Sequence, residues 1–415
     1  MPRKSHRNWL LSAEHIGGGC PAAIEELDKP EWQRYEVLTH TPPERAWCDA
    51  LHRHGIRAMP YLNLGYEYAS DYPPGQASPF AVIDQLNRPQ LQTNYLRHDG
   101  KLIYESCHNT KEAHDLYLKR AEAIMKTGAD GLFLDNAGPA RKCWGPQFGR
   151  HEHLYAGDPK ARAEGHRPFC YSKAQRRYRF EVPIADEEQT YATAMLIGEL
   201  RKLVRSHRPD GCLMINGGDG SSMPPIFFDQ VDAVMNEMFI YANYLDYNLP
   251  VPTHLDFQDH DIMDWLSTLE WEDEFRRRGV RMANLPSFSP HDPNRKRHSF
   301  FAFCVGKLWD AIYYTTSDPE TGVWLREIRL GEPLGEKPGS WGAVLYREFE
   351  HGLVAANPYG IAQEARVPWT HKPNRVVIYQ DAHDLTIRHE SVEPDADGTI
   401  VVKLFPDKAA LIVAE

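Results

Sequence analysis

The stretch that decides the fold is Gly128-Ala129-Asp130-Gly131-Leu132-Phe133-Leu134-Asp135-Asn136. Its apolar body, residues 130–135, predicts a buried β-strand, and the glycine before it ends a helix predicted over residues 111–127. A buried strand that ends in a carboxylate is unfavourable unless the carboxylate has a partner or a chemical task. Asp135 is therefore the first candidate for a catalytic residue. The alternative is that it caps the following turn.

The same order of helix, glycine and short β-rich run recurs along the chain. Further helices are predicted over residues 44–54, 187–207, 261–278 and 295–309, with Asp186 and Gln189 as a capping box for the second of these. Strands are predicted over residues 8–14, 35–39, 56–62, 130–135, 212–216, 231–237, 280–285 and 311–315. Eight strands that alternate with helices predict an α/β fold, a (β/α)8 TIM barrel. An open doubly wound sheet is the alternative, but no dinucleotide-binding fingerprint follows the first strand.

The chain divides at about residue 317. Residues 1–317 are predicted to form the barrel, with long insertions at 64–110 and 137–186 that leave the end where barrels build active sites. Residues 318–340, rich in Gly and Pro, are predicted to be a linker. Turn signals in residues 341–415 separate six predicted short strands, at 343–349, 353–356, 375–379, 385–389, 399–405 and 410–413. They predict a C-terminal antiparallel β-sandwich domain.

Composition limits the classes of function. The net charge of −11 and the lack of a long Lys/Arg run argue against nucleic-acid binding. The longest apolar run, residues 300–305, is too short to span a membrane, and no signal peptide is expected, so a cytoplasmic protein is predicted. The sequence does not indicate an oligomeric state.

Metal and disulfide chemistry are not expected from the cysteine pattern. The seven cysteines are scattered and include no CxxC pair, which argues against a disulfide framework. His151-Glu152-His153, with Cys143 and Cys170 nearby in sequence, contains the residue types of a structural zinc site. Their spacing is irregular, so no metal and no cofactor are predicted.

A second carboxylate is predicted at the mouth of the barrel. Two carboxylates across such a mouth can act as nucleophile and general acid. Glu237 ends the strand 231–237 among apolar neighbours, which favour a protonated acid, whereas Asp219 lies in a glycine-rich turn. We favour Glu237 as the acid, with Asp219 as its rival. Residues predicted to contact a polyhydroxylated ligand are Glu14, His15, Tyr61, Asn63, Asn136, Asn216, Asp219, Asn284 and Tyr314.

Residues 128–136 resemble the strand-4 nucleophile segment of retaining glycoside hydrolases with barrel folds, the superfamily of the α-amylases, α-glucosidases and α-galactosidases. Residues 346–358 resemble the β-sandwich that follows such barrels. Phe133 stands where α-amylases carry an arginine, so a less characterised glycosidase-like group fits better. The resemblance implies that Asp135 is the nucleophile and that the acid/base lies on strand 5 or 6, at Asp219 or Glu237.

The predicted activity is therefore hydrolysis of an O-glycosidic bond in an oligosaccharide or glycoside, by retention and without a cofactor. Two alternatives stay open. One is a carbohydrate-binding barrel protein without turnover, and the other is a transglycosylase or another sugar-active enzyme that uses the same pocket.

Overall fold

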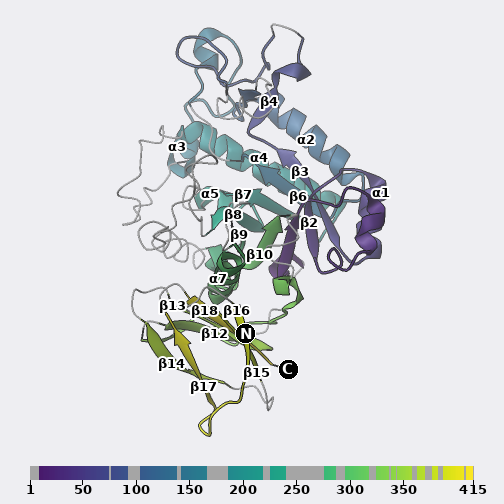
Figure 1. Cartoon of the computed structure of the whole chain (residues 1–415). Coiled ribbons are helices and arrows are strands. Elements are labelled where there is room, and N and C mark those ends of the chain that lie inside the picture. The colour runs from purple at the N-terminus through teal and green to yellow at the C-terminus, as the bar shows by residue number, and fades with distance from the viewer. Residues whose placement is uncertain are drawn as a thin grey trace, which may run out of the picture.

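The computed structural model describes residues 9–73, 76–91, 103–137, 142–165, 186–217, 225–239, 275–286, 295–316, 324–335, 338–342, 344–357, 362–369, 376–381, 387–405 and 408–414. Eight parallel strands close into a barrel in the order β1-β10-β9-β8-β7-β6-β3-β2 (Figure 1). They are β1 (His15–Gly18), β2 (Val37–Thr41), β3 (Arg57–Asn63), β6 (Gly131–Asp135), β7 (Cys212–Asn216), β8 (Ala233–Phe239), β9 (Arg281–Pro286) and β10 (Ile312–Thr316). The (β/α)8 prediction is confirmed, and the doubly wound alternative is wrong.

Helices cover the outside of the barrel. They are α1 (Arg45–Arg53), α2 (Lys111–Met125), α3 (Pro159–Gly165), α4 (Glu187–His207), α5 (Pro225–Phe228) and α7 (Arg295–Leu308). The predicted cap of α4 is confirmed, because the Asp186 side chain accepts the backbone N–H of Gln189 at 3.0 Å. Most of the helix predicted over 261–278 lies outside the described residues.

Seven of the eight predicted strands agree with the structure to within two residues at each end, and the first is wrong. Residues 8–14 do not form a strand, because Trp9–Leu11 is a short 3-10 helix and β1 begins only at His15. Leu10 is fully buried and packs with side chains that fill the barrel, such as Ile16 and Met59. Leu10 therefore fills the barrel from a 3-10 helix and not from a strand.

Carboxylates close the end of the barrel where the strands begin. Glu36, Asp130 and Asp232, here called the basal carboxylates, each directly precede a barrel strand. Glu36 accepts the backbone N–H of His15 at 2.9 Å, Asp130 that of Ala58 at 2.8 Å, and Asp232 that of Leu213 at 2.9 Å. Each basal carboxylate thereby bonds to the neighbouring strand, so these three links hold adjacent strands in register.

Asp232 offers a test of how much such a link stabilises the fold. It also accepts from Arg201 at 2.6 Å and from Arg205 at 2.8 Å, and it is 1% exposed. We expect Asp232→Asn to lower the free energy of unfolding by about 3 kcal/mol, because charged hydrogen bonds to buried groups are lost. The matched control is Asp229→Asn, whose exposed carboxylate faces Arg278 at 3.5 Å and should cost under about 1 kcal/mol. Urea denaturation measures both, and equal losses would contradict the prediction.

Antiparallel sheets follow the barrel. One has the strand order β11-β12-β13-β18-β15-β16 and the other pairs β14 with β17. Their bounds are β11 (Gly339–Trp341), β12 (Val344–Phe349), β13 (Gly352–Asn357), β14 (Gln363–Pro368), β15 (Val376–Asp381), β16 (Ile387–Val392), β17 (Thr399–Leu404) and β18 (Lys408–Ala414). All six strands predicted in this region are present, whereas β11 and β14 were not predicted.

The larger sheet packs on the barrel through α7, which lies between them in Figure 1. Phe300, Phe303 and Leu308 of α7 share one buried cluster with Val354 of β13 and Leu411 of β18. A second buried cluster contains side chains of both sheets, including Val344 of the larger and Val402 of the smaller one. The region after the barrel therefore has its own apolar core and a firm contact with the barrel.

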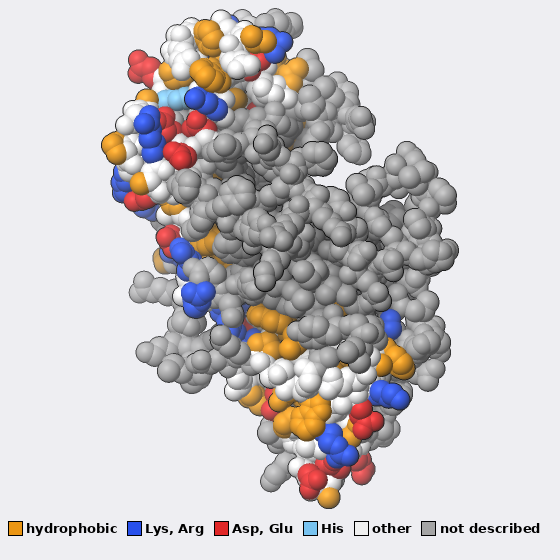
Figure 2. Space-filling model, turned by 90° about the vertical axis from the view of Figure 1, so that its left-hand side faces the viewer, with side chains coloured by type: hydrophobic (Ala, Val, Ile, Leu, Met, Phe, Trp, Pro, Cys, Tyr) orange, Lys and Arg blue, Asp and Glu red, His pale blue; other side chains and the backbone are white. Residues whose placement is uncertain are grey.

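The described surface on one face carries acidic and basic side chains close to one another and not a patch of one sign (Figure 2). Among the described helices, none has the length and apolar character needed to cross a membrane.

Candidate active site

Asp135 is the last residue of β6 and lies on the inner side of the barrel. Side chains of this strand alternate, with Phe133 in the cluster that fills the barrel and Leu132 and Leu134 in the cluster under the helices. Asp135 continues the inner series and is half-buried. Because β3 and β6 both end at this side of the barrel, the insertions 64–110 and 137–186 leave from the same end. This end is where active sites of (β/α)8 barrels lie.

Four hydrogen bonds hold the Asp135 carboxylate. Its Oδ1 accepts from the backbone N–H of Asn136 at 2.8 Å and from Asn216 Nδ2 at 2.9 Å. Its Oδ2 accepts from Tyr61 Oη at 2.8 Å and from Asn136 Nδ2 at 2.9 Å. The donors come from β3, β7 and the residue after β6, so three neighbouring strand ends fix the position of one carboxylate.

Tyr61 is in turn held by Asn63, on the same strand. Asn63 Nδ2 donates to Tyr61 Oη at 2.9 Å, and its Oδ1 accepts the backbone N–H groups of Gly65 and Tyr66 at 2.8 and 3.2 Å. Burial, and then the neighbouring Asp135 carboxylate, raise the pKa of Tyr61 above its usual value. The phenol therefore stays protonated and donates to Asp135 at neutral pH.

The backbone around Asp135 is shaped for close approach. Asn136 has φ of +50°, a left-handed conformation that Asn adopts more readily than most other residues with a side chain. A Cβ on Gly65 would lie 2.5 Å from the Cβ of Asn136, so only glycine fits there. His108 stabilises this turn, because its Nε2–H donates to the Leu64 carbonyl at 2.6 Å. Burial lowers the pKa of His108 to about 4.

His40 was not among the predicted site residues, yet it lies beside Asp135. Its ring stacks on Tyr61 and approaches Phe133, with centroid distances of 4.9 Å to each. The strand β2 changes register between Thr39 and Thr41, and His40 between them has φ of +56°. This bulge turns the His40 side chain toward the neighbouring strands. The sequence carries no signal for it, because the predicted strand ended at residue 39.

Of the two predicted acids, the structure describes only the backbone of Glu237. Glu237 belongs to β8, and Asn216 of β7 pairs in register with Met235, two residues before it. The Glu237 side chain and the whole of Asp219 lie outside the described residues. Of the predicted ligand-contacting residues, the structure gathers Tyr61, Asn63, Asn136 and Asn216 around Asp135.

Glu14 and His15 do not lie at the mouth, because the first strand begins at His15 and not at residue 8, as predicted. They therefore stand at the opposite end, with the basal carboxylates. The Glu14 carboxylate accepts the backbone N–H groups of Leu330 and Gly331, both at 3.2 Å. His15 is fully buried, with Nε2 at 2.9 Å from the Ile328 carbonyl. Both residues attach the barrel to the segment that follows it.

Asn284 and Tyr314 are also corrected. Ala283 and Leu285 belong to the cluster inside the barrel, so the alternation of β9 turns Asn284 outward with Met282. Asn284 is 2% exposed and Tyr314 is 1% exposed. Tyr314 lies inside the barrel, with its hydroxyl 2.5 Å from Thr39 Oγ1, among the side chains that fill it.

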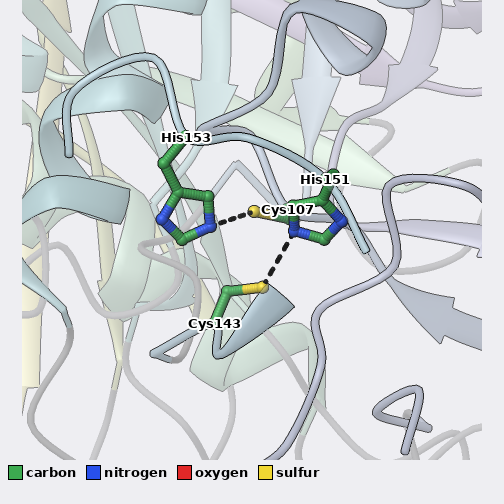
Figure 3. A group of neighbouring side chains, drawn as sticks. All are labelled: Cys107, Cys143, His151 and His153. Carbon is green, nitrogen blue, oxygen red and sulfur yellow. Dashed lines mark hydrogen bonds between the residues drawn. The ribbon is translucent and has the colours of Figure 1, made fainter. Parts of the chain in front are cut away.

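A group of thiol and imidazole side chains lies in the insertions. Sulfur and imidazole nitrogen atoms of Cys107, Cys143, His151 and His153 lie within 4.8 Å of one another (Figure 3). Cys143, His151 and His153 are three of the residues with the chemistry of a zinc site in the sequence, and Cys170, the fourth, lies outside the described residues. Cys107 comes from the other insertion and was not predicted as part of this group, because the spacing within one segment does not show a residue from another.

Comparisons with known proteins support the fold. No protein-family model matches the chain, and no curated protein sequence matches it. Among solved structures, trehalose-6-phosphate hydrolase from Bacillus licheniformis is 11% identical with a TM-score of 0.52, over 98% of this chain and 100% of that chain. An α-amylase from Anoxybacillus is 11% identical with a TM-score of 0.52, over 99% of each chain.

A maltogenic α-amylase from Thermotoga neapolitana is also similar in structure. It is 9% identical with a TM-score of 0.52, over 96% of this chain and 98% of that chain. The chain thus shares its fold with (β/α)8-barrel glycoside hydrolases along nearly its full length. The resemblance predicted from residues 128–136 is confirmed at the level of the fold.

Proposed function

We propose that this protein is a glycoside hydrolase that cleaves an O-glycosidic bond with retention of configuration. The observation that carries the proposal is the Asp135 carboxylate, held by four donors at the catalytic end of a barrel whose fold is shared with glycoside hydrolases. Retaining enzymes need a carboxylate whose position is fixed relative to the sugar ring. The bonds from Tyr61, Asn136 and Asn216 supply this restraint.

In this mechanism, an Asp135 oxygen attacks the anomeric carbon as the glycosidic bond breaks, which gives a covalent glycosyl-enzyme. Glu237 protonates the leaving oxygen in the first step and takes a proton from the attacking water in the second. The position of Glu237 on β8 supports this role, because β7 alone separates that strand from β6. Asp219, which follows β7, is the rival for the acid role.

The surroundings of Asp135 suit a sugar. The side-chain amides of Asn136 and Asn216 lie directly beside the carboxylate, where sugar hydroxyls would bind, and the His40 and Tyr61 rings offer apolar faces. The insertions 64–110 and 137–186 would wall the pocket and set the length of substrate that fits. We further propose that residues 1–317 are the catalytic domain and that the sheets of residues 341–415 form one β-sandwich.

The experiment is a screen of purified full-length protein against chromogenic and natural glycosides, with Asp135→Asn as the inactive control. NMR of the first-formed product reports its anomeric configuration, and retention is the expected result. Binding of a glycan without any release of sugar would favour the carbohydrate-binding alternative. Transfer to an added alcohol that exceeds hydrolysis would favour a transglycosylase.

Tyr61→Phe is expected to lower kcat about tenfold, because one hydrogen bond that fixes the nucleophile is lost. The matched control is Tyr35→Phe, which removes another buried phenol bond, 2.9 Å from Thr315 Oγ1 and on the outer side of the barrel. Steady-state kinetics on the best substrate and Tm values for both variants make the comparison. An equal loss of kcat in both variants would show that Tyr61 acts through stability alone.

A further inference from the structure

The two insertions meet at a group of thiols and imidazoles. Cys107 follows the short strand β5 (Ile103–Glu105) of the first insertion. Cys143, His151 and His153 belong to the second insertion, around the 3-10 helix Gly145–Phe148. Figure 3 shows the four side chains pointing toward one another. Cys107 is fully buried and Cys143 is 6% exposed, while both histidines are half-buried.

The distances between these atoms suit one tetrahedral metal ion. Cys107 Sγ lies 3.5 Å from His153 Nε2, and Cys143 Sγ lies 3.2 Å from His151 Nε2. With the usual zinc–sulfur and zinc–nitrogen bond lengths, tetrahedral geometry separates a sulfur from a nitrogen ligand by about 3.5 Å. All four ligand atoms lie within 4.8 Å of one another, so shifts of about 1 Å would complete the coordination shell.

We propose that Cys107, Cys143, His151 and His153 bind one zinc ion as a structural site that joins the two insertions. Two thiolates with two imidazoles in a tetrahedron are the donor set that selects zinc over the harder divalent ions. Four protein ligands leave no open position, so the ion has a structural and not a catalytic task. This inference stands independently of the proposed glycosidase activity.

Groups around the ligands suit thiolates. The backbone N–H groups of Ile83 and Gly145 point at Cys143 Sγ from 3.3 and 3.4 Å. Gln189 Nε2 lies 3.1 Å from Cys107 Sγ. The residue whose backbone N–H donates to the Asp186 cap of α4 therefore also contacts a ligand. Donors of this kind stabilise metal-bound sulfur and orient it.

Gly145 leaves the space that the His151 ring occupies. A Cβ at this position would lie 2.2 Å from His151 Nε2 and 2.5 Å from its Cε1. The atom nearest to that missing Cβ is the nitrogen that faces Cys143. Glycine at this position therefore lets the His151 ring reach the Cys143 sulfur, as binding of one metal ion by both residues requires.

The zinc site would complete a junction that backbone bonds begin. Leu154 N–H donates to the Asn109 carbonyl at 2.9 Å, and Trp144 N–H donates to the Ile83 carbonyl at 2.8 Å. These bonds cross between the two insertions at the residues that directly follow Cys143 and His153. A metal ion that links them would remove conformational freedom from two long segments that the barrel alone does not restrain.

The first test measures the metal content of the purified full-length protein by inductively coupled plasma mass spectrometry. The protein is first dialysed against buffer with zinc and then against buffer without zinc. We expect about one zinc per chain. Cobalt(II) in place of zinc should give strong visible bands and a thiolate-to-cobalt charge-transfer band. Chelation of the metal should lower Tm by about 5 °C or more.

Variants assign the ligands. Cys143→Ser and His151→Ala should each lower zinc affinity at least about tenfold, since each removes one ligand. Gly145→Ala, which leaves every ligand in place, should also weaken binding. The control is Cys20→Ser, a partly exposed cysteine of the barrel, which should keep the wild-type zinc content. If Cys143→Ser does not fold, His151→Ala and the cobalt spectrum of the wild-type protein still test whether these residues bind the metal.

Three results would overturn the proposal. One is a zinc content near zero after reconstitution under reducing conditions. Another is equal zinc content in Cys20→Ser, Cys143→Ser and His151→Ala. The third is a Cys107–Cys143 disulfide, found by peptide mass mapping, together with a failure of the reduced protein to take up cobalt with thiolate bands.

Discussion

Asp135→Asn is expected to lower kcat by about 10⁴-fold while the protein still folds, because the amide keeps the shape of the carboxylate but cannot attack an anomeric carbon. The swap also changes the hydrogen bonds, since the Asn216 and Asn136 amides donate to both carboxylate oxygens. One of these contacts becomes donor against donor, so a loss of about 1–2 kcal/mol in stability is expected as well. Kinetics and urea denaturation separate the two effects.

The control for Asp135→Asn is Asp115→Asn, an exposed aspartate of α2 that pairs with Lys111. It should leave kcat within about twofold of the wild-type value, as surface pairs contribute little. A fluorinated glycoside inactivator, which traps the covalent intermediate, should label the wild-type protein at Asp135 in peptide mapping. Label on another carboxylate, or more than a tenth of wild-type kcat in Asp135→Asn, would remove Asp135 from the nucleophile role.

Glu237→Gln is expected to lower kcat on natural glycosides by about 10³-fold and on activated aryl glycosides far less, because aryl leaving groups need little protonation. Asp219→Asn should show no such split between substrates. Added azide, which replaces water in the second step without a general base, should restore turnover of the aryl glycoside by Glu237→Gln and give a glycosyl azide.

The same pair of variants can reverse the assignment. A leaving-group split and azide rescue in Asp219→Asn, with neither in Glu237→Gln, would move the acid role to Asp219. Equal losses on both kinds of substrate in both variants would contradict each candidate and direct attention to other carboxylates of the insertions. This comparison does not depend on Asp135, because the acid is assigned from leaving-group dependence.

The residues around Asp135 could be predicted wherever the ends of the strands that carry them could be predicted. The segments 130–135 and 212–216 are apolar runs bounded by glycine and polar residues, so their ends were placed to within one residue, and Asp135 and Asn216 with them. The first strand failed because its neighbouring apolar run packs inside the barrel as a 3-10 helix. Burial is visible in a sequence, but whether a short apolar run is strand or plug is decided by tertiary packing.

His40 and Cys107 escaped prediction for a different reason. His40 reaches its neighbours through a bulge with a left-handed backbone, and no local sequence pattern predicts that bulge. Cys107 lies 36 residues before Cys143 in another insertion, and only the closed barrel brings β3 and β6 side by side so that their insertions meet. Contacts between segments that are distant in sequence follow from topology, which a linear reading of spacing does not contain.

The basal carboxylates have a consequence for how such a protein can diversify. The interactions of Glu36, Asp130 and Asp232 with neighbouring strands lie at the end of the barrel opposite Asp135 and the insertions. Substitutions, lengthening or exchange of the insertions therefore leave the closure of the barrel untouched, since distant sites act additively. Natural selection, or an engineer, can revise what the open end recognises without having to rescue the scaffold each time.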